Sequence, residues 1–185
     1  PDGRYVVFQR MADRHMRVWR MNLDGSDQKP ISEGPLDLGP IAAPDGVVYF
    51  YRVTDGSPRT HRISIDGGAA AVLNADENFR PLDVSPDGTR LLGVGWDVEQ
   101  RRSALGIMPA SGGRIRLLSD LPTFAGSFSQ DASGVIFPVQ EKGSVRLDHY
   151  DLATGKTSLR GMLRDHGFRG ALSPGVTRIA LARGE

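Results

Sequence analysis

Two groups of arginine residues, one of them beside a tryptophan, are the strongest candidates for binding chemistry in this sequence. The candidate binding residues are Arg10, Arg14, Trp96, Asp97, Arg101 and Arg102. A guanidinium donates paired hydrogen bonds to a carboxylate or a phosphate, so the doublet of Arg101 and Arg102 near Trp96 predicts a site for an acidic partner or a phosphate. A charged loop that contacts only solvent is the alternative interpretation, and the sequence leaves it open.

The residue patterns of the common catalytic and metal sites do not occur in this sequence. It contains no cysteine, which excludes a thiol nucleophile and cysteine-ligated zinc, and its four histidines are too far apart for a local metal motif. The serine-hydrolase pattern Gly-x-Ser-x-Gly, a glycine-rich phosphate loop and the kinase triplet Asp-Phe-Gly are also missing. We therefore expect no catalysis, no metal and no cofactor in this chain.

Composition and charge exclude several further classes of protein. The 185 residues are 39% hydrophobic and 24% charged, a balance typical of one globular domain. Twenty-three basic residues against 22 acidic ones give a net charge of +1, which argues against nucleic-acid binding. No apolar run reaches the roughly 18 residues of a membrane-spanning helix. The absence of cysteine fits a cytoplasmic or an extracytoplasmic location equally well, so the localisation stays open.

An internal repeat of 42 to 44 residues organises the whole chain. A Pro-Asp-Gly turn starts at Pro1, Pro44 and Pro86, and degenerate copies lie at Gln130 and Pro174. A second glycine-containing turn follows within each complete copy, and runs of β-branched and aromatic residues flank both turns. Each copy therefore predicts four short antiparallel strands, A to D, although the fourth D strand has a poor pattern. The copies are residues 1–43, 44–85, 86–129, 130–173 and the incomplete 174–185.

Four short antiparallel strands in about 43 residues are typical of one β-propeller blade. The predicted fold is all-β: a single partial β-propeller domain, residues 1–185, forming an open arc of about four four-stranded blades. The first copy has no A strand and the last ends after strand B, so we expect the arc to be part of a six- to eight-bladed ring. Closing a four-bladed ring with strand A of the fifth copy would leave the strand at residues 178–183 without a place.

Two motifs, Ser-Pro-Asp-Gly-Thr-Arg at residues 85–90 and residues 18–26, resemble the repeat of TolB-type β-propellers. The resemblance covers the chain and implies a non-catalytic module that senses a ligand or binds a protein or peptide. Residues 179–185 resemble the last blade of propellers fused behind bacterial serine/threonine kinase domains, which implies the C-terminal region of such a multidomain protein. The alternative is the gating propeller of a prolyl-oligopeptidase-like serine peptidase, with its catalytic domain outside this chain.

The repeat also predicts which face of the propeller binds a partner. The A–B and C–D turns are short and uniform, and they lie on one face, here called the A–B face. The B–C and D–A connections lie on the opposite face, here called the B–C face, and we expect them to be longer and more variable. Five of the candidate residues fall on B–C connections, at residues 10–15 and 97–103, and Trp96 directly precedes the second of these connections. Because variable loops on a rigid scaffold usually carry binding sites, we expect the B–C face to bind the partner.

Overall fold

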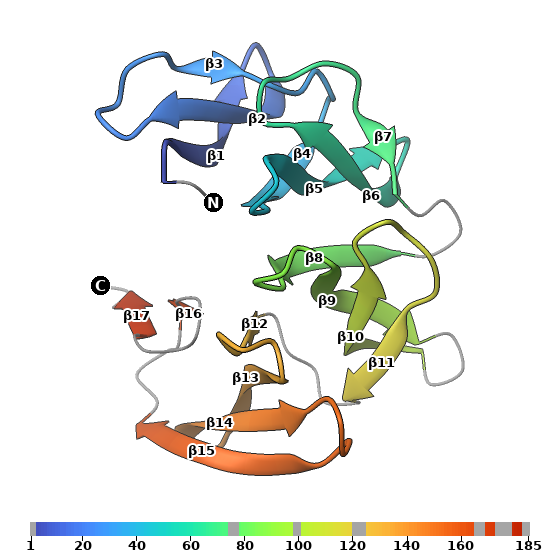
Figure 1. Ribbon diagram of the computed structural model, residues 1–185, viewed down its shortest axis with the longest axis vertical. Coiled ribbons are helices and arrows are strands. Elements are labelled where there is room, and N and C mark those ends of the chain that lie inside the picture. The colour runs from blue at the N-terminus through green and yellow to red at the C-terminus, as the bar shows by residue number, and fades with distance from the viewer. Residues whose placement is uncertain are drawn as a thin grey trace.

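The computed structural model describes residues 3–73, 78–97, 101–119, 125–164, 169–172 and 179–182. The regular secondary structure of these residues consists of β-strands, which form sheets that follow one another around an open arc (Figure 1). This arrangement confirms the prediction of an all-β, partial β-propeller. We number the sheets as blades 1 to 5 in chain order.

Each blade takes its strands from one continuous segment, and neighbouring strands pair antiparallel. Blade 1 contains β1 (Tyr5–Ala12), β2 (His15–Asn22) and β3 (Lys29–Pro30). Blade 2 contains β4 (Asp37–Ala42), β5 (Val47–Thr54), β6 (Ser57–Ser64) and β7 (Ala71–Val72). Blade 3 contains β8 (Phe79–Val84), β9 (Arg90–Asp97), β10 (Arg102–Pro109) and β11 (Arg116–Ser119). Blade 4 contains β12 (Ser127–Phe128), β13 (Gly134–Glu141), β14 (Ser144–Asp151) and β15 (Thr157–Arg164), and blade 5 contains β16 (Arg169–Leu172) and β17 (Ile179–Ala182).

The D strand of blade 4 is well formed, although the sequence pattern that predicted it is poor. The strand β15 is eight residues long, and it pairs with β14 on both sides of an irregularity between Leu147 and Asp148. Its apolar residues Leu159 and Met162 are each 58% exposed. Backbone pairing at the outer edge of the sheet therefore holds this strand more than burial does, and a pattern based on burial underestimates it.

Among the described residues, the hydrophobic core consists of three clusters, one between each pair of neighbouring blades from 1 to 4. Successive residues of a strand point to opposite faces of its sheet, so the consecutive residues Leu91 and Leu92 of β9 enter two different clusters. The cluster between blades 1 and 2 contains Val18, Ile31, Val48, Phe50 and Ile63. The next contains Ala43, Tyr49, Phe79, Leu91, Met108 and Ala110, and the third contains Leu92, Leu105, Ile107, Phe128, Val135, Phe137 and Val139.

The A–B turn of blade 3 is a compact hydrogen-bonded unit. Oδ1 of Asp87 accepts hydrogen bonds from the Ser85 hydroxyl at 2.5 Å and from the amide and hydroxyl of Thr89 at 3.0 and 2.8 Å. The Ser85 oxygen in turn accepts a hydrogen bond from the Arg90 amide at 2.9 Å. These contacts fix the point at which strand B begins.

Blade 4 keeps the same contacts although its turn lacks the proline. Oδ1 of Asp131 accepts from the Ser129 hydroxyl at 2.6 Å and from the amide and hydroxyl of Ser133 at 3.1 and 2.8 Å. In blade 2, where Ala43 and Val47 replace the two hydroxyl residues, the bond from the Val47 amide to Asp45 remains, at 3.2 Å. The carboxylate and the two hydroxyls, rather than the proline, are therefore what blades 3 and 4 share.

We predict that Ser129→Ala raises the pKa of Asp131. Hydrogen bonds, that from the Ser129 hydroxyl first, hold the pKa of Asp131 at about 2, below its ordinary value of 3.8. Because the folded-state pKa is lowered, the stabilisation is complete above about pH 4 and is lost as the pH falls toward 2. Side-chain NMR titration measures the shift, with Asp87 of the same variant as the internal control. An unchanged pKa for Asp131 would contradict this account of the turn.

We also predict that Ala132→Gly stabilises the chain. Ala132 has a φ of 57° at the position that Gly46 and Gly88 occupy in blades 2 and 3 with φ of 80° and 72°. Relief of the left-handed strain, less the entropy cost of glycine, gives a gain of about 0.5–1 kcal/mol in the free energy of unfolding, measured by denaturant titration. Gly88→Ala is the matched control and should lose a similar amount, because a Cβ there meets only Pro44 Cδ, at 3.8 Å. A destabilised Ala132→Gly variant would exclude this interpretation.

Candidate functional site

The B–C connections are tighter than the sequence indicated. Strand B and strand C are joined by two residues in blades 1, 2 and 4, so the prediction of long B–C connections is wrong for these blades. The strands continue to the tip of each hairpin with polar side chains, and such side chains resemble loop residues in a sequence. In consequence Arg10 lies within β1, Trp96 and Asp97 end β9, and Arg102 begins β10.

The residue immediately before each C strand adopts a positive φ. These residues are Arg14 at 65°, Gly56 at 71°, Arg101 at 51° and Gly143 at 78°. Glycine adopts this conformation freely, whereas a residue with a Cβ loses roughly 1–2 kcal/mol. Blades 1 and 3 therefore carry arginine where the backbone favours glycine. Strain of this kind at an exposed residue is a reason to look for a role other than stability.

A cavity of about 200 Å³ lies beside Trp96 on the B–C face. Trp96 is 51% exposed, and the hydroxyl of Tyr51 donates a hydrogen bond to Oδ1 of Asn78 at 2.8 Å. Burial raises the pKa of Tyr51 above its ordinary value, so this hydroxyl stays a neutral donor. The residues that line the cavity are Tyr51, Asn78, Arg80, Val94, Gly95, Trp96 and Ser103. The cavity thus offers aromatic rings, an amide and a guanidinium from blades 2 and 3.

The structure divides the six predicted residues into two groups. Trp96, Asp97, Arg101 and Arg102 lie at the tip of blade 3, where Asp97 and Arg102 are opposite one another on β9 and β10. The side chain of Asp97 and residues 98–100 lie outside the described part of the chain. Arg10 and Arg14 belong to blade 1, which blade 2 separates from blade 3 (Figure 1).

Sequence reasoning missed the other residues of the cavity at Trp96. Tyr51 comes from strand B of blade 2, Asn78 directly precedes strand A of blade 3, and Arg80 lies within that strand. No local motif connects these positions to Trp96, because their proximity depends on how two sheets pack. Of the residues that line the cavity, the sequence singled out only Trp96, through the basic doublet of Arg101 and Arg102 near it.

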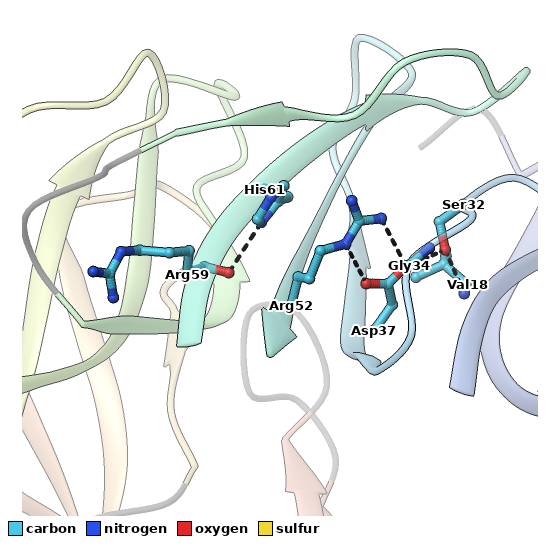
Figure 2. Close-up of polar contacts among 7 residues, drawn as sticks. All are labelled: Val18, Ser32, Gly34, Asp37, Arg52, Arg59 and His61. Atoms are coloured by element: carbon cyan, nitrogen blue, oxygen red, sulfur yellow. Dashed lines mark hydrogen bonds and ion pairs between the residues drawn. The ribbon is translucent and has the colours of Figure 1, made fainter. Parts of the chain in front are cut away.

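A buried carboxylate joins blade 1 to blade 2. Asp37 is fully buried and accepts hydrogen bonds from Nε and Nη2 of Arg52 at 2.6 and 2.9 Å (Figure 2). The Ser32 hydroxyl donates to the same carboxylate at 2.6 Å and the Gly34 amide at 3.1 Å, while the Ser32 oxygen accepts from the Val18 amide at 2.9 Å. A carboxylate that accepts four hydrogen bonds is suited to holding the fold and not to transferring a proton.

Polar contacts also join the other pairs of blades. The Thr60 hydroxyl of blade 2 donates to the Phe79 carbonyl of blade 3. Asp83 of blade 3 accepts from the Ser127 hydroxyl at 2.7 Å and from the Phe128 amide at 2.8 Å, and burial raises its pKa. These groups have structural partners, so they are not candidates for catalysis.

His61 is a buried residue on strand C of blade 2. Its ring stacks on Phe50 with centroids 5.6 Å apart, and its Nδ1 lies 3.2 Å from the Arg59 carbonyl oxygen (Figure 2). Burial lowers the pKa of His61, so the ring is neutral at pH 7. Within the described segments, no three His, Cys, Asp or Glu side chains form a group that could hold a metal ion.

A second cavity, of about 320 Å³, opens on the A–B face between blades 1 and 2. Behind it the guanidinium of Arg20 lies 4.2 Å from the centroid of the Tyr5 ring, and its Nη2 lies 3.2 Å from Asp27 and 4.0 Å from Asp66. The residues that line this cavity are Arg4, Tyr5, Ala42, Ala43, Pro44, Asp45, Gly46, Ser64, Ile65 and Asp66.

Comparison with known proteins shows which fold the chain has, but no protein family to which its sequence belongs. No family model and no curated protein sequence matches this chain. A TolB-like protein from Agrobacterium tumefaciens superposes with a TM-score of 0.76 at 15% identity, covering 89% of this chain and 63% of that one. TolB from Acinetobacter baumannii gives 0.73 at 20% identity, covering 97% and 46%. A puromycin hydrolase gives 0.63 at 18% identity, covering 97% and 31%.

These superpositions define the class of protein. The chain has the fold of the TolB-type β-propellers, as its repeat motifs indicated. It spans less than two thirds of the length of each of these structures. The described residues include no helix long and apolar enough to cross a membrane.

We predict that Arg14→Gly increases stability. Glycine relieves the positive φ of 65° and loses some entropy on folding, so the free energy of unfolding should rise by about 0.5–1 kcal/mol in a denaturant titration. Gly56→Arg, at the same position of blade 2, is the matched control and should lose a similar amount, since a Cβ there meets no atom within 4 Å. Lower stability of Arg14→Gly would show that the arginine side chain supports the fold.

Proposed function

We propose that this chain is a non-catalytic binding module that docks a protein or peptide partner on its B–C face. The observation that carries the proposal is the tip of blade 3. There a half-exposed Trp96 lies beside a cavity, and Arg101 occupies a backbone conformation that favours glycine. Tryptophan and arginine are the residues that most often dominate the energy of protein interfaces.

The size and chemistry of the cavity support a macromolecular partner. A volume of about 200 Å³ is smaller than the roughly 300–1,000 Å³ of pockets that enclose a small-molecule ligand. It is suited to one side chain that a partner inserts between Tyr51 and Trp96. Arg80 lines the cavity, and Arg101 and Arg102 lie at the same tip of blade 3, so the partner should present acidic side chains next to an apolar group.

The polar groups of the fold support the absence of catalysis. Asp37 and Asp83 are buried carboxylates, and both accept hydrogen bonds from neighbouring blades. The sequence contains no motif for an activated serine, a thiol or a kinase site. This combination favours recognition over turnover.

We further propose that the module works within a longer multidomain protein. The resemblance of residues 179–185 to propellers fused behind bacterial serine/threonine kinases supports a kinase as the attached domain. The structural likeness to a puromycin hydrolase, which covers 97% of this chain, supports a second candidate, the gating propeller of a serine peptidase. The sequence of the complete gene distinguishes them, because a peptidase requires a hydrolase domain with Gly-x-Ser-x-Gly.

We predict that replacing Arg101 and Arg102 together by glutamate weakens partner binding. Charge reversal opposes acidic groups of the partner, so the dissociation constant should rise at least about tenfold, or ~1.4 kcal/mol. A partner captured by affinity purification is titrated by calorimetry against each variant.

The matched control changes the opposite face. Asp66→Ala with Ser111→Ala alters two C–D turns on the A–B face and should leave the affinity within about twofold, the scale of ordinary surface substitutions. Equal losses from both pairs of substitutions, at matched folding by circular dichroism, would rule out the B–C face as the binding surface.

A further inference from the structure

The cavity beside Trp96 is built mainly on one face of blade 3. Arg80 of β8 is opposite Val94 of β9. Trp96 of β9 is opposite Ser103 of β10. Side chains that are opposite one another in an antiparallel pair, or two residues apart on one strand, point to the same face of the sheet. These four side chains therefore line the cavity from a single face, and Tyr51 reaches it from blade 2.

The polar side chains of this cavity favour a ligand that accepts hydrogen bonds. A guanidinium and an indole N–H can only donate, which applies to Arg80 and Trp96. The hydroxyl of Tyr51 donates to Oδ1 of Asn78 at 2.8 Å, so the acceptor of this amide is engaged within the protein and its N–H groups can serve a ligand. No carboxylate of a described residue lines the cavity. A carboxylate, which is negative and only accepts, is therefore the group that fits these donors best.

The same cavity also offers apolar surface to a ligand. The rings of Tyr51 and Trp96 and the side chain of Val94 line it. Trp96 is 51% exposed, so much of its ring is in contact with solvent. An aromatic ring in this position is stabilised by contact with an apolar side chain that displaces the solvent. The ligand should therefore combine a carboxylate with an apolar group.

The dimensions of the cavity indicate that both groups come from one residue. Val94, which is opposite Arg80, and Trp96 are two residues apart, so the two levels are separated by roughly 7 Å along the strand. The volume of about 200 Å³ leaves room for little more than one residue. Aspartate and glutamate carry a carboxylate at the tip of the side chain and no apolar group beyond it. A C-terminal leucine or phenylalanine has its α-carboxylate next to a complete apolar side chain, so it supplies both groups at once.

We propose that this cavity binds the C-terminal residue of a partner chain, an apolar residue with a free α-carboxylate. The carboxylate is directed toward Arg80, and the apolar side chain packs against Trp96 and Tyr51. The N–H groups of Asn78 donate to the carboxylate or to the backbone carbonyl that precedes it. This inference rests on the proposed function, because it names the part of the partner that the B–C face recognises.

The test uses short peptides that differ only at the C-terminus. A fluorescein-labelled Gly-Ser-Gly-Ser-Gly-Leu with a free carboxylate, and its counterpart that ends in phenylalanine, are titrated with the intact 185-residue chain and followed by fluorescence anisotropy. We expect saturable binding. A C-terminal amide removes the negative charge, and a final glycine removes the apolar side chain, so each change should weaken binding by at least about tenfold.

Two variants of the protein assign the two parts of the site. Arg80→Gln should weaken binding of the free-acid leucine peptide by at least about tenfold and that of its amide much less, because only the acid carries the charge. Trp96→Ala should weaken binding of the leucine peptide much more than that of the glycine peptide. Arg160→Gln removes an exposed arginine from β15 of blade 4 and is the matched control that should leave every affinity unchanged. Thermal unfolding checks that each variant is folded, and the comparison of peptides on the unaltered chain needs no variant.

Three results would overturn the inference. One is the absence of saturable binding by both free-acid peptides, and another is equal binding of the amides. The third is equal binding of an amidated peptide with aspartate next to leucine, because it would assign the site to an acidic side chain within a chain. None of these results removes the docking function, which is tested by the effect of the Arg101 and Arg102 substitutions on a captured partner. A captured partner that is insensitive to those substitutions would contradict the docking function instead.

Discussion

The alternation of side chains along a strand is the constraint on which this fold depends. Because successive residues point to opposite faces, strand B of blade 2 and strands B and C of blade 3 bury apolar side chains on both sides. No single sheet can cover both of its own faces, so each blade requires a neighbour. The three hydrophobic clusters between the blades are the result. Apolar contact has no preferred direction, so the polar contacts at Asp37, Thr60 and Asp83 fix how each blade is oriented relative to the next.

The buried pair of Asp37 and Arg52 is costly to place in the interior unless every group is satisfied. Ser32 and Gly34 meet this condition by donating to the carboxylate from the segment that leads out of blade 1. The carboxylate of Asp37 therefore contacts both the segment that follows blade 1 and the neighbouring strand of its own sheet, and so fixes the position of one blade relative to the other.

The fold could be predicted from the sequence because its turns are local motifs. The contacts between blades could not be predicted, because they join residues far apart in the sequence. Pro-Asp-Gly and the second glycine turn recur at fixed spacing, and local hydrogen bonds such as those of Asp87 hold them, so the sheets could be derived from the sequence. Trp96 was a candidate because it lies near the basic doublet of Arg101 and Arg102 in the sequence. The cavity beside it depends on the packing of two sheets and carries no local signal. The B–C connections were misjudged because polar strand ends such as Arg10 resemble loop residues.

The left-handed backbone at Arg14 and Arg101 has a consequence for multivalent recognition. Both residues precede a C strand, so the two guanidiniums leave alternate blades from the same structural position. Their separation is fixed by two packed interfaces rather than by flexible linkers. A ligand that carries two acidic segments at a matching separation would hold the second at high effective concentration once the first is bound. If both arginines belong to the proposed binding surface, the fixed distance between blades 1 and 3 would let the arc discriminate between partners by the distance between their acidic segments.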